Sequence, residues 1–120
     1  MALNKMWFKI EMVRGDISDQ TFTVDSDDTV TDLDEIYFTV KKHYYENAFL
    51  FQKRLSEGSI VVVDPTYNKY GFRIQPEDTN KLPFGEYVCD IEIKKEGELL
   101  KTFNGKLTLY EEVTTARNEL

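Results

Sequence analysis

The densest group of potential metal ligands in this sequence is the acidic stretch 25–34, DSDDTVTDLD. Calcium binds several oxygen atoms, and a carboxylate-rich loop can supply them. The spacing does not match an EF-hand loop, because Val30 stands where the sharp turn requires glycine and Ile36 where the loop requires a bidentate glutamate. We therefore expect a solvated turn and no functional metal site. The carboxylates concerned are Asp25, Asp27, Asp28, Asp32 and Asp34.

Nucleophilic catalysis requires a serine or cysteine next to a base, and the chain offers few combinations. His43 is the single histidine and lies beside Tyr44 and Tyr45. Cys89, the single cysteine, falls on the apolar side of an alternating segment, which favours a small core residue over a reactive thiolate. Four serines lie in turn-like contexts without a nucleophile elbow: Ser18, Ser26, Ser56 and Ser59. We expect neither enzymatic activity nor a cofactor.

Arg14, Gly15 and Asp16 spell a tripeptide known from cell adhesion. Adhesion requires an extracellular protein with the tripeptide at an exposed loop tip, and the sequence shows no secretion signal. The alternation over 6–13 ends at this point, so the simpler interpretation is a strand that ends in a turn. Gly15 then supplies the backbone freedom that a turn needs, and Asp16 can cap it.

The overall composition opposes several classes of function. The 120 residues are 41% hydrophobic and 31% charged, which fits one soluble domain with a modest core. A net charge of −7 opposes binding to nucleic acid or anionic lipid. No apolar run is long enough to insert in a membrane, and the first residues do not form a Sec signal, so we expect synthesis in a cytoplasm. A single cysteine excludes an intramolecular disulfide.

Alternation of apolar and polar residues is the dominant pattern along the chain. Such a pattern predicts strands with one face in a core and the other in water. The clearest segments are 6–13, 35–42, 70–75, 87–95 and 106–113. Weaker segments are 20–25, 49–55, 59–64 and 98–103. Of these, 59–64 (SIVVVD) is apolar enough to predict a strand buried on both sides.

Turn residues suggest how the last strands connect. The pair Asn104-Gly105 suits a type I′ turn, in which both central residues have positive φ. Together with the turn at 96–98, it predicts a three-stranded antiparallel meander over 86–113.

We predict an all-β fold, an immunoglobulin-like antiparallel β-sandwich of about eight or nine strands over 1–114, with a tail over 115–120. A small β-barrel is the alternative.

One local feature favours the immunoglobulin-like interpretation. Pro76 can begin a single helical turn over 76–82, and Tyr87 follows at the start of a strand, two residues before Cys89. In immunoglobulin-like domains a tyrosine at this place bonds through its hydroxyl to upstream backbone. We therefore expect Tyr87 to be buried, with its hydroxyl bonded to the backbone near 76–82.

Several tyrosines fall on polar faces or in loops, where aromatic side chains often mark contact surfaces for proteins or sugars. Ordinary packing along the edges of amphipathic strands explains them equally well. The tyrosines are Tyr37, Tyr44, Tyr45, Tyr67 and Tyr110.

Short motifs recur in a definite order from about Met6 to Thr114, and the most specific run is 77–91, EDTNKLPFGEYVCDI. Their order resembles that in small proteins from the tail gene regions of phages and prophages of Gram-positive bacteria. It is also similar to the immunoglobulin-like N-terminal domain of phage upper baseplate proteins. The motif residues include Arg14, Gly15, Asp16, Asp32, Leu33, Glu77, Asp78, Thr79, Leu82, Gly85, Tyr87, Asp90 and Ile91, with the segments 40–42 and 105–114.

This resemblance implies a virion or tail-assembly component. It also implies that 14–16 is a strand-to-turn element, with Asp16 accepting backbone hydrogen bonds and Arg14 pairing with a nearby acid. The leading hypothesis is a non-enzymatic structural or adaptor module of a phage tail or baseplate, which binds other tail proteins or itself. The alternative is a carbohydrate-binding module that contacts host surface glycans.

Overall fold

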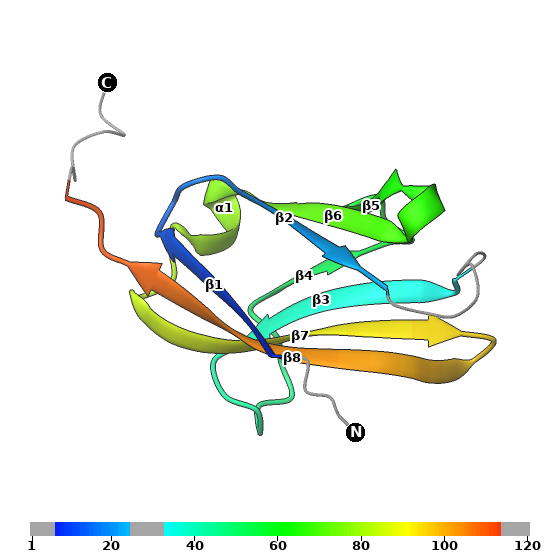
Figure 1. Cartoon of the computed structure of the whole chain (residues 1–120). Helices are drawn as coiled ribbons and strands as arrows, with labels where there is room; N and C mark the ends of the chain where they lie inside the picture. The colour runs from blue at the N-terminus through cyan, green and yellow to red at the C-terminus, as the bar shows by residue number, and fades with distance from the viewer. Residues whose placement is uncertain (1–6, 25–32, 114–120) are drawn as a thin grey trace.

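The computed structural model describes residues 7–24 and 33–113, and within them the chain forms eight strands and two short helical turns (Figure 1). The strands are β1 Trp7–Val13, β2 Ser18–Thr23, β3 Glu35–Lys41, β4 Phe51–Arg54, β5 Ile60–Asp64, β6 Lys69–Ile74, β7 Gly85–Lys95 and β8 Glu98–Tyr110. The turns are the 3-10 helix η1 Pro65–Tyr67 and the one-turn helix α1 Pro76–Thr79.

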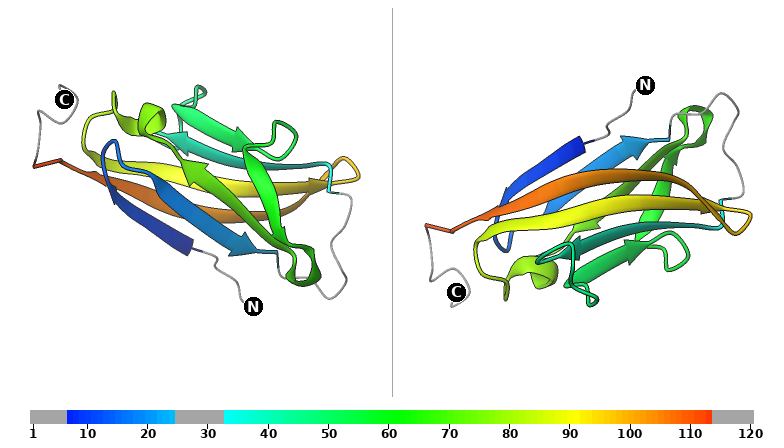
Figure 2. Two further views of the ribbon diagram at one scale, coloured as in Figure 1. Left: turned by 90° about the horizontal axis from the view of Figure 1, so that it is seen from above. Right: turned by 90° about the horizontal axis from the view of Figure 1, so that it is seen from below.

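The strands form two layers. One sheet has five strands in the order β1-β8-β7-β3-β4, and the other has three in the order β2-β6-β5. Figure 2 shows the smaller sheet lying across one face of the larger. The chain places β3, β7 and β8 together in one layer and β2, β5 and β6 in the other, which is the arrangement of an immunoglobulin-like sandwich. The predicted fold class is therefore confirmed.

The sheets are not entirely antiparallel, however. β1 runs parallel to β8, with Trp7 opposite Asn104 and Val13 opposite Tyr110. Only strands joined by a hairpin must be antiparallel, and β1 continues instead into β2 of the other sheet. Its direction beside β8 therefore depends on a pairing between distant segments, which local turn signals do not report.

The predicted three-stranded meander over 86–113 is wrong. β7 and β8 form a two-stranded hairpin, and β8 continues through Asn104-Gly105 without a turn. Gly105 lies opposite Cys89 in this ladder, and a Cβ on Gly105 would lie 2.7 Å from the ring of Phe8. A glycine inside a strand often marks such a close approach, so the residue makes room for Phe8 rather than for a turn.

The prediction that 59–64 is buried on both sides is also wrong. β5 is an edge strand of the three-stranded sheet, and only Ile60 is buried. The side chains of Val61, Val62 and Val63 are each about half exposed. A short apolar run does not reveal whether a second layer covers it, and among the described residues no layer covers the outer side of this sheet.

The core lies between the sheets, where the alternation predicted it. Tyr87, Cys89 and Ile93 on β7 are all buried. Phe38 of the larger sheet stacks on Phe72 of the smaller, with ring centroids 4.2 Å apart. This stacked aromatic contact joins the two layers.

The helical turn that begins at Pro76 is confirmed. Tyr87 is 1% exposed, and its hydroxyl donates a hydrogen bond to the carbonyl of Pro83. The acceptor lies one residue beyond the predicted range, because the chain continues past α1 before it turns back into β7. Nζ of Lys42 lies 4.9 Å from the centroid of the Tyr87 ring.

We predict that Tyr87→Phe lowers the free energy of unfolding by about 1–2 kcal/mol, because the carbonyl of Pro83 loses its partner in a partly buried place. Denaturant titration measures the change. Tyr110→Phe is the matched control, since the Tyr110 hydroxyl bonds Glu11 at the surface and its loss should have little effect. Equal stability of Tyr87→Phe and the unsubstituted protein would contradict the prediction.

Candidate functional site

The tripeptide 14–16 lies in the turn where the chain passes from β1 to β2, and it contacts the region of α1. The backbone N–H of Gly15 donates to Oγ1 of Thr79 over 2.9 Å, and Thr79 is fully buried. Gly15 has φ of 85°, a left-handed conformation that favours glycine. The guanidinium of Arg14 donates to the carbonyl of Leu82 at 3.0 Å. Two motifs distant in the sequence thus bond directly to each other.

Arg14 also binds the segment that follows β8. Its guanidinium donates two hydrogen bonds to the carboxylate of Glu112, at 2.6 and 3.3 Å, and its backbone N–H donates to the carbonyl of Tyr110. The bond to Glu112 raises the pKa of Arg14. We refer to Arg14, Gly15, Thr79, Leu82 and Glu112 together as the clamp. Its bonds hold the Arg14 side chain to the protein's own structure.

Asp78, an acidic residue of the motif 77–91, also stabilises the fold. Asp78 accepts a hydrogen bond from Nζ of Lys53 at 2.6 Å and another from the backbone N–H of Gln75 at 2.7 Å. The first joins α1 to β4, and the second caps the helical turn. Glu77 precedes Asp78 in this turn, and Gly85 begins β7.

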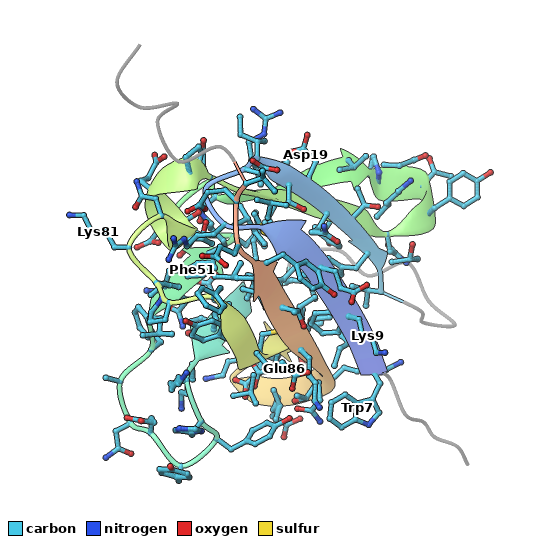
Figure 3. The ribbon with its side chains drawn as sticks, turned by 90° about the vertical axis from the view of Figure 1, so that its left-hand side faces the viewer. Trp7, Lys9, Asp19, Phe51, Lys81 and Glu86 are labelled. Carbon is cyan, nitrogen blue, oxygen red and sulfur yellow. The ribbon has the colours of Figure 1, made fainter. Side chains whose placement is uncertain are left out.

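Asp90 alone among the motif residues of β7 lies in a hollow of the outer face of the five-stranded sheet. The β3–β4 loop, residues 42–50, extends on this side of the sheet, away from the second layer (Figures 1 and 3). Two adjoining cavities, of about 320 and about 100 Å³, lie between the loop and the sheet. We name them together the Asp90 hollow, after the residues Thr39, Lys41, Asn47, Phe49, Gln52 and Asp90.

Strand register places the polar groups of the hollow in one row. Gln52, Thr39 and Asp90 are direct neighbours across β4, β3 and β7. Nε2 of Gln52 donates to Oγ1 of Thr39 at 2.9 Å, which fixes the orientation of the amide. Phe49 in the loop is 51% exposed and borders the same cavity.

Burial raises the pKa of Asp90 to about 6, and the neighbouring carboxylate of Glu92 adds to the effect. The positive charge of Lys41 opposes it. Within the described residues, no hydrogen bond reaches the Asp90 carboxylate. Asp90 is therefore a half-buried acid whose charged form is incompletely compensated.

Tyr37 borders the hollow on β3, beneath two cationic side chains. The guanidinium of Arg54 lies 5.0 Å from its ring centroid, and Nζ of Lys94 lies 5.7 Å away. Arg54 is in turn held by the buried carboxylate of Glu35 at 3.0 Å. Hydrogen bonds from Ser56, Ile36 and Arg54 lower the pKa of Glu35 despite its burial.

The structure does not gather the predicted contact tyrosines on one surface. Tyr37 and Tyr44 line the Asp90 hollow, and Tyr45, which is 80% exposed, follows in the same loop. Tyr67 lies in η1, between β5 and β6. Tyr110 ends β8 and bonds Glu11.

Within the described residues, no hydrogen bond joins the candidate catalytic side chains to one another. His43 stacks on Tyr45 with ring centroids 5.0 Å apart. Cys89 is buried, and burial raises the pKa of its thiol to about 12, so the thiolate is scarce at neutral pH. Ser56 bonds Glu35, and Ser59 bonds the backbone of Arg54.

No group of three metal-ligating side chains occurs in the described parts of the chain. Residues 25–32, with Ser26 and most of the acidic stretch that could bind calcium, lie outside those parts. Asp34 accepts a hydrogen bond from the backbone N–H of Gly97 at 2.7 Å. None of the helical segments in the described parts of the chain has the length and hydrophobicity that spanning a bilayer requires.

Sequence reasoning missed Asn47, Phe49 and Gln52 as members of a site. The alternation did place Thr39 and Asp90 on the polar faces of their strands. The position of the loop over the sheet depends on its tertiary packing, and no short motif encodes it.

No protein family and no curated protein matches the sequence. The structure is similar to that of the NK cell receptor NKp44, with a TM-score of 0.51 and 13% identity over 85% of this chain and 96% of that one. Two further similarities have TM-scores of 0.48. One is to the extracellular domain of the voltage-gated sodium channel β4 subunit, with 12% identity over 94% of this chain and 98% of that one. The other is to the endo-β-1,4-mannanase from Thermotoga petrophila, with 16% identity over 84% of this chain, which spans only 18% of the enzyme. At these identities the likeness shows the fold alone.

We predict that Glu92→Gln lowers the pKa of Asp90 from about 6, because it removes a neighbouring negative charge. A carbon-detected NMR titration of the side-chain carboxyl measures it. Glu86→Gln, on the same strand, is the matched control and should leave the value unchanged. A pKa of Asp90 close to 3.8, the ordinary value of an aspartate, in the unsubstituted protein would contradict the prediction.

The same group predicts how stability depends on pH. The native pKa of Asp90 is higher than the unfolded one, so between about pH 4 and pH 6 the native state binds more protons than the unfolded state. The contribution of Asp90 to the free energy of unfolding therefore falls as the pH rises through this window. Asp90→Asn should remove that decline in denaturant titrations at pH 4 to 7. An unchanged slope in the variant would refute this assignment.

Proposed function

We propose that this protein is a non-enzymatic structural or adaptor module of a phage or prophage tail or baseplate, and that it acts through protein–protein contacts. Support comes from the sequence resemblance over 14–16 and 77–91. Residues of these two segments form hydrogen bonds with each other in the clamp. A protein with the same fold would therefore need both segments. The proposed partners are other tail proteins, and the proposed location is the virion after synthesis in the host cytoplasm.

The observation that best supports a contact surface is the Asp90 hollow. It lies on an open sheet face and has a half-exposed aromatic side chain, Phe49, at its border. Tyr44 lines the adjoining part and is 60% exposed. Aromatic side chains in partly hollowed surfaces are frequent centres of binding energy at protein interfaces. The half-buried carboxylate of Asp90 would favour a partner that brings a hydrogen-bond donor or a positive charge.

A carbohydrate-binding module is the second candidate, and the same hollow supports it. The amides of Asn47 and Gln52 and the carboxylate of Asp90 can bond hydroxyl groups as donors and acceptors. The rings of Tyr44 and Phe49 offer apolar faces to a sugar ring. In this case the ligand would be a host surface glycan.

We predict that Phe49→Ala and Tyr44→Ala each weaken binding to a tail partner by about ten-fold or more, because each removes an exposed aromatic contact. The melting temperature should hardly change, since both side chains are more than half exposed in the loop. The measurement is sedimentation velocity with the products of neighbouring genes. Tyr67→Ala and Tyr110→Ala are matched controls, because both tyrosines are exposed and lie away from the hollow.

Glycan-array binding that Phe49→Ala abolishes would favour the carbohydrate-binding candidate instead. Turnover of a glycan or peptide substrate, with no binding to the products of neighbouring genes, would contradict the adaptor proposal.

A further inference from the structure

The four edge strands of the sandwich differ in charge. An edge strand presents unpaired backbone N–H and C=O groups, and proteins commonly block such edges with charged side chains. β1, β2 and β4 all carry charged residues within the strand. In β5 the run Ile60–Val63 has none, and Asp64 comes only at its end. Among the edge strands in the described parts of the chain, β5 is the one that lacks this protection.

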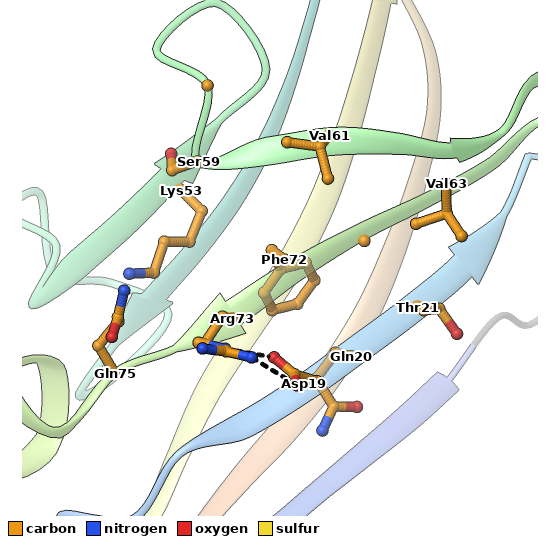
Figure 4. A pocket seen from close by; sticks show the side chains of 12 residues that line it. Asp19, Gln20, Thr21, Lys53, Ser59, Val61, Val63, Phe72, Arg73 and Gln75 are labelled. Atoms are coloured by element: carbon orange, nitrogen blue, oxygen red, sulfur yellow. Dashed lines mark hydrogen bonds and ion pairs between the residues drawn. The ribbon is translucent and has the colours of Figure 1, made fainter.

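The valines of β5 also leave apolar surface exposed. Val61 and Val63 lie on the outer side of the three-stranded sheet (Figure 4). Val61 pairs with Gly71 of β6. A Cβ on Gly71 would lie 2.9 Å from Cγ2 of Val63, so the glycine leaves room for that valine. A cavity of about 370 Å³ continues along this face to the ion pair between Asp19 and Arg73.

We propose that β5 is a self-association edge, at which a second copy of this chain adds its own β5 in antiparallel orientation. A two-fold axis at Val61 places Val61 opposite Val61 of the second copy and Ile60 opposite Val62. The two three-stranded sheets then form one continuous six-stranded sheet. Such pairing is self-complementary, as a two-fold interface requires.

The register of β5 places the axis at Val61 rather than further along the strand. Ile60, Val61 and Val62 pair regularly with β6, and the register shifts between Val62 and Asp64. The bulge ends the regular edge, so the paired segment is short. An interface of this size falls in the weak class, and we expect a dissociation constant on the order of 100 µM.

The distribution of charge favours a second copy as the occupant. The chain has a net charge of −7, which opposes self-association in general. The three strands of the smaller sheet, however, contain two acids and two bases and are therefore neutral. These residues are Asp19, Asp64, Lys69 and Arg73. Asp64 and its symmetry mate also lie away from the axis, so pairing does not bring like charges directly opposite each other.

The test is sedimentation equilibrium of the full chain from about 10 µM to about 1 mM, a range that brackets the expected constant. We expect a monomer–dimer equilibrium. Val61→Lys should raise the dissociation constant about ten-fold or more, because two ammonium groups would face each other across the axis. Val113→Lys is the matched control, since Val113 is 99% exposed and lies after β8. Melting curves establish that both variants fold.

Cross-linking provides a second, independent readout. Val61→Cys should form a disulfide-linked dimer under mild oxidation, because directly opposed residues of antiparallel strands lie close enough for a disulfide. The native Cys89 is buried and should not compete. Val113→Cys should cross-link at least about ten-fold more slowly under the same oxidising conditions and at the same pH. A monomer at all concentrations, or equal cross-linking of the two variants, would overturn the proposal. Dimerisation that Val61→Lys leaves unchanged would overturn it too.

Discussion

The hydrogen bond between the backbone N–H of Gly15 and the buried hydroxyl of Thr79 is the interaction on which the rest of this sandwich depends. The chain must pass from the larger sheet to the smaller between β1 and β2, and the N–H of Gly15 in that passage bonds Oγ1 of Thr79. Leaving a buried polar group without its partner costs about 1–3 kcal/mol. The bond therefore strongly favours a passage next to α1. Once it is made, the guanidinium of Arg14 lies within reach of Leu82 and Glu112.

The two faces of β7 have different roles in the domain. Inward side chains, such as Tyr87 and Ile93, fill the core and hold the helical turn near the sheet. An outward one, Asp90, lies in the hollow beneath the loop 42–50. Since the side-chain period of a strand is two, a shift of register by one residue would exchange these sets. The core thereby also fixes the position of the candidate binding surface.

The fold class, the buried face of β7 and the helical turn at Pro76 could be read from the sequence, because each depends on alternation or on local backbone chemistry. The parallel pairing of β1 could not, because it joins segments that no turn connects. Gly105 was misread for a related reason: the ring of Phe8, which the glycine accommodates, comes from a distant strand. The hollow itself was not predicted. Tyr37 and Tyr44 of its lining were expected as contact residues, and alternation placed Thr39 and Asp90 on polar faces, but the loop that completes the hollow has no periodic pattern.

The pairing of β1 with β8 has a consequence for synthesis on the ribosome. Trp7 emerges first, but its partner Asn104 follows 97 positions later (104 − 7). At translation rates of roughly 5–20 residues per second, β1 waits about 5–20 seconds for its place in the sheet. During that time its apolar side chains, Ile10 and Met12, have no β8 to cover them. The β7–β8 hairpin is made of neighbouring segments and can close quickly, so β1 is expected to join a sheet that has already formed.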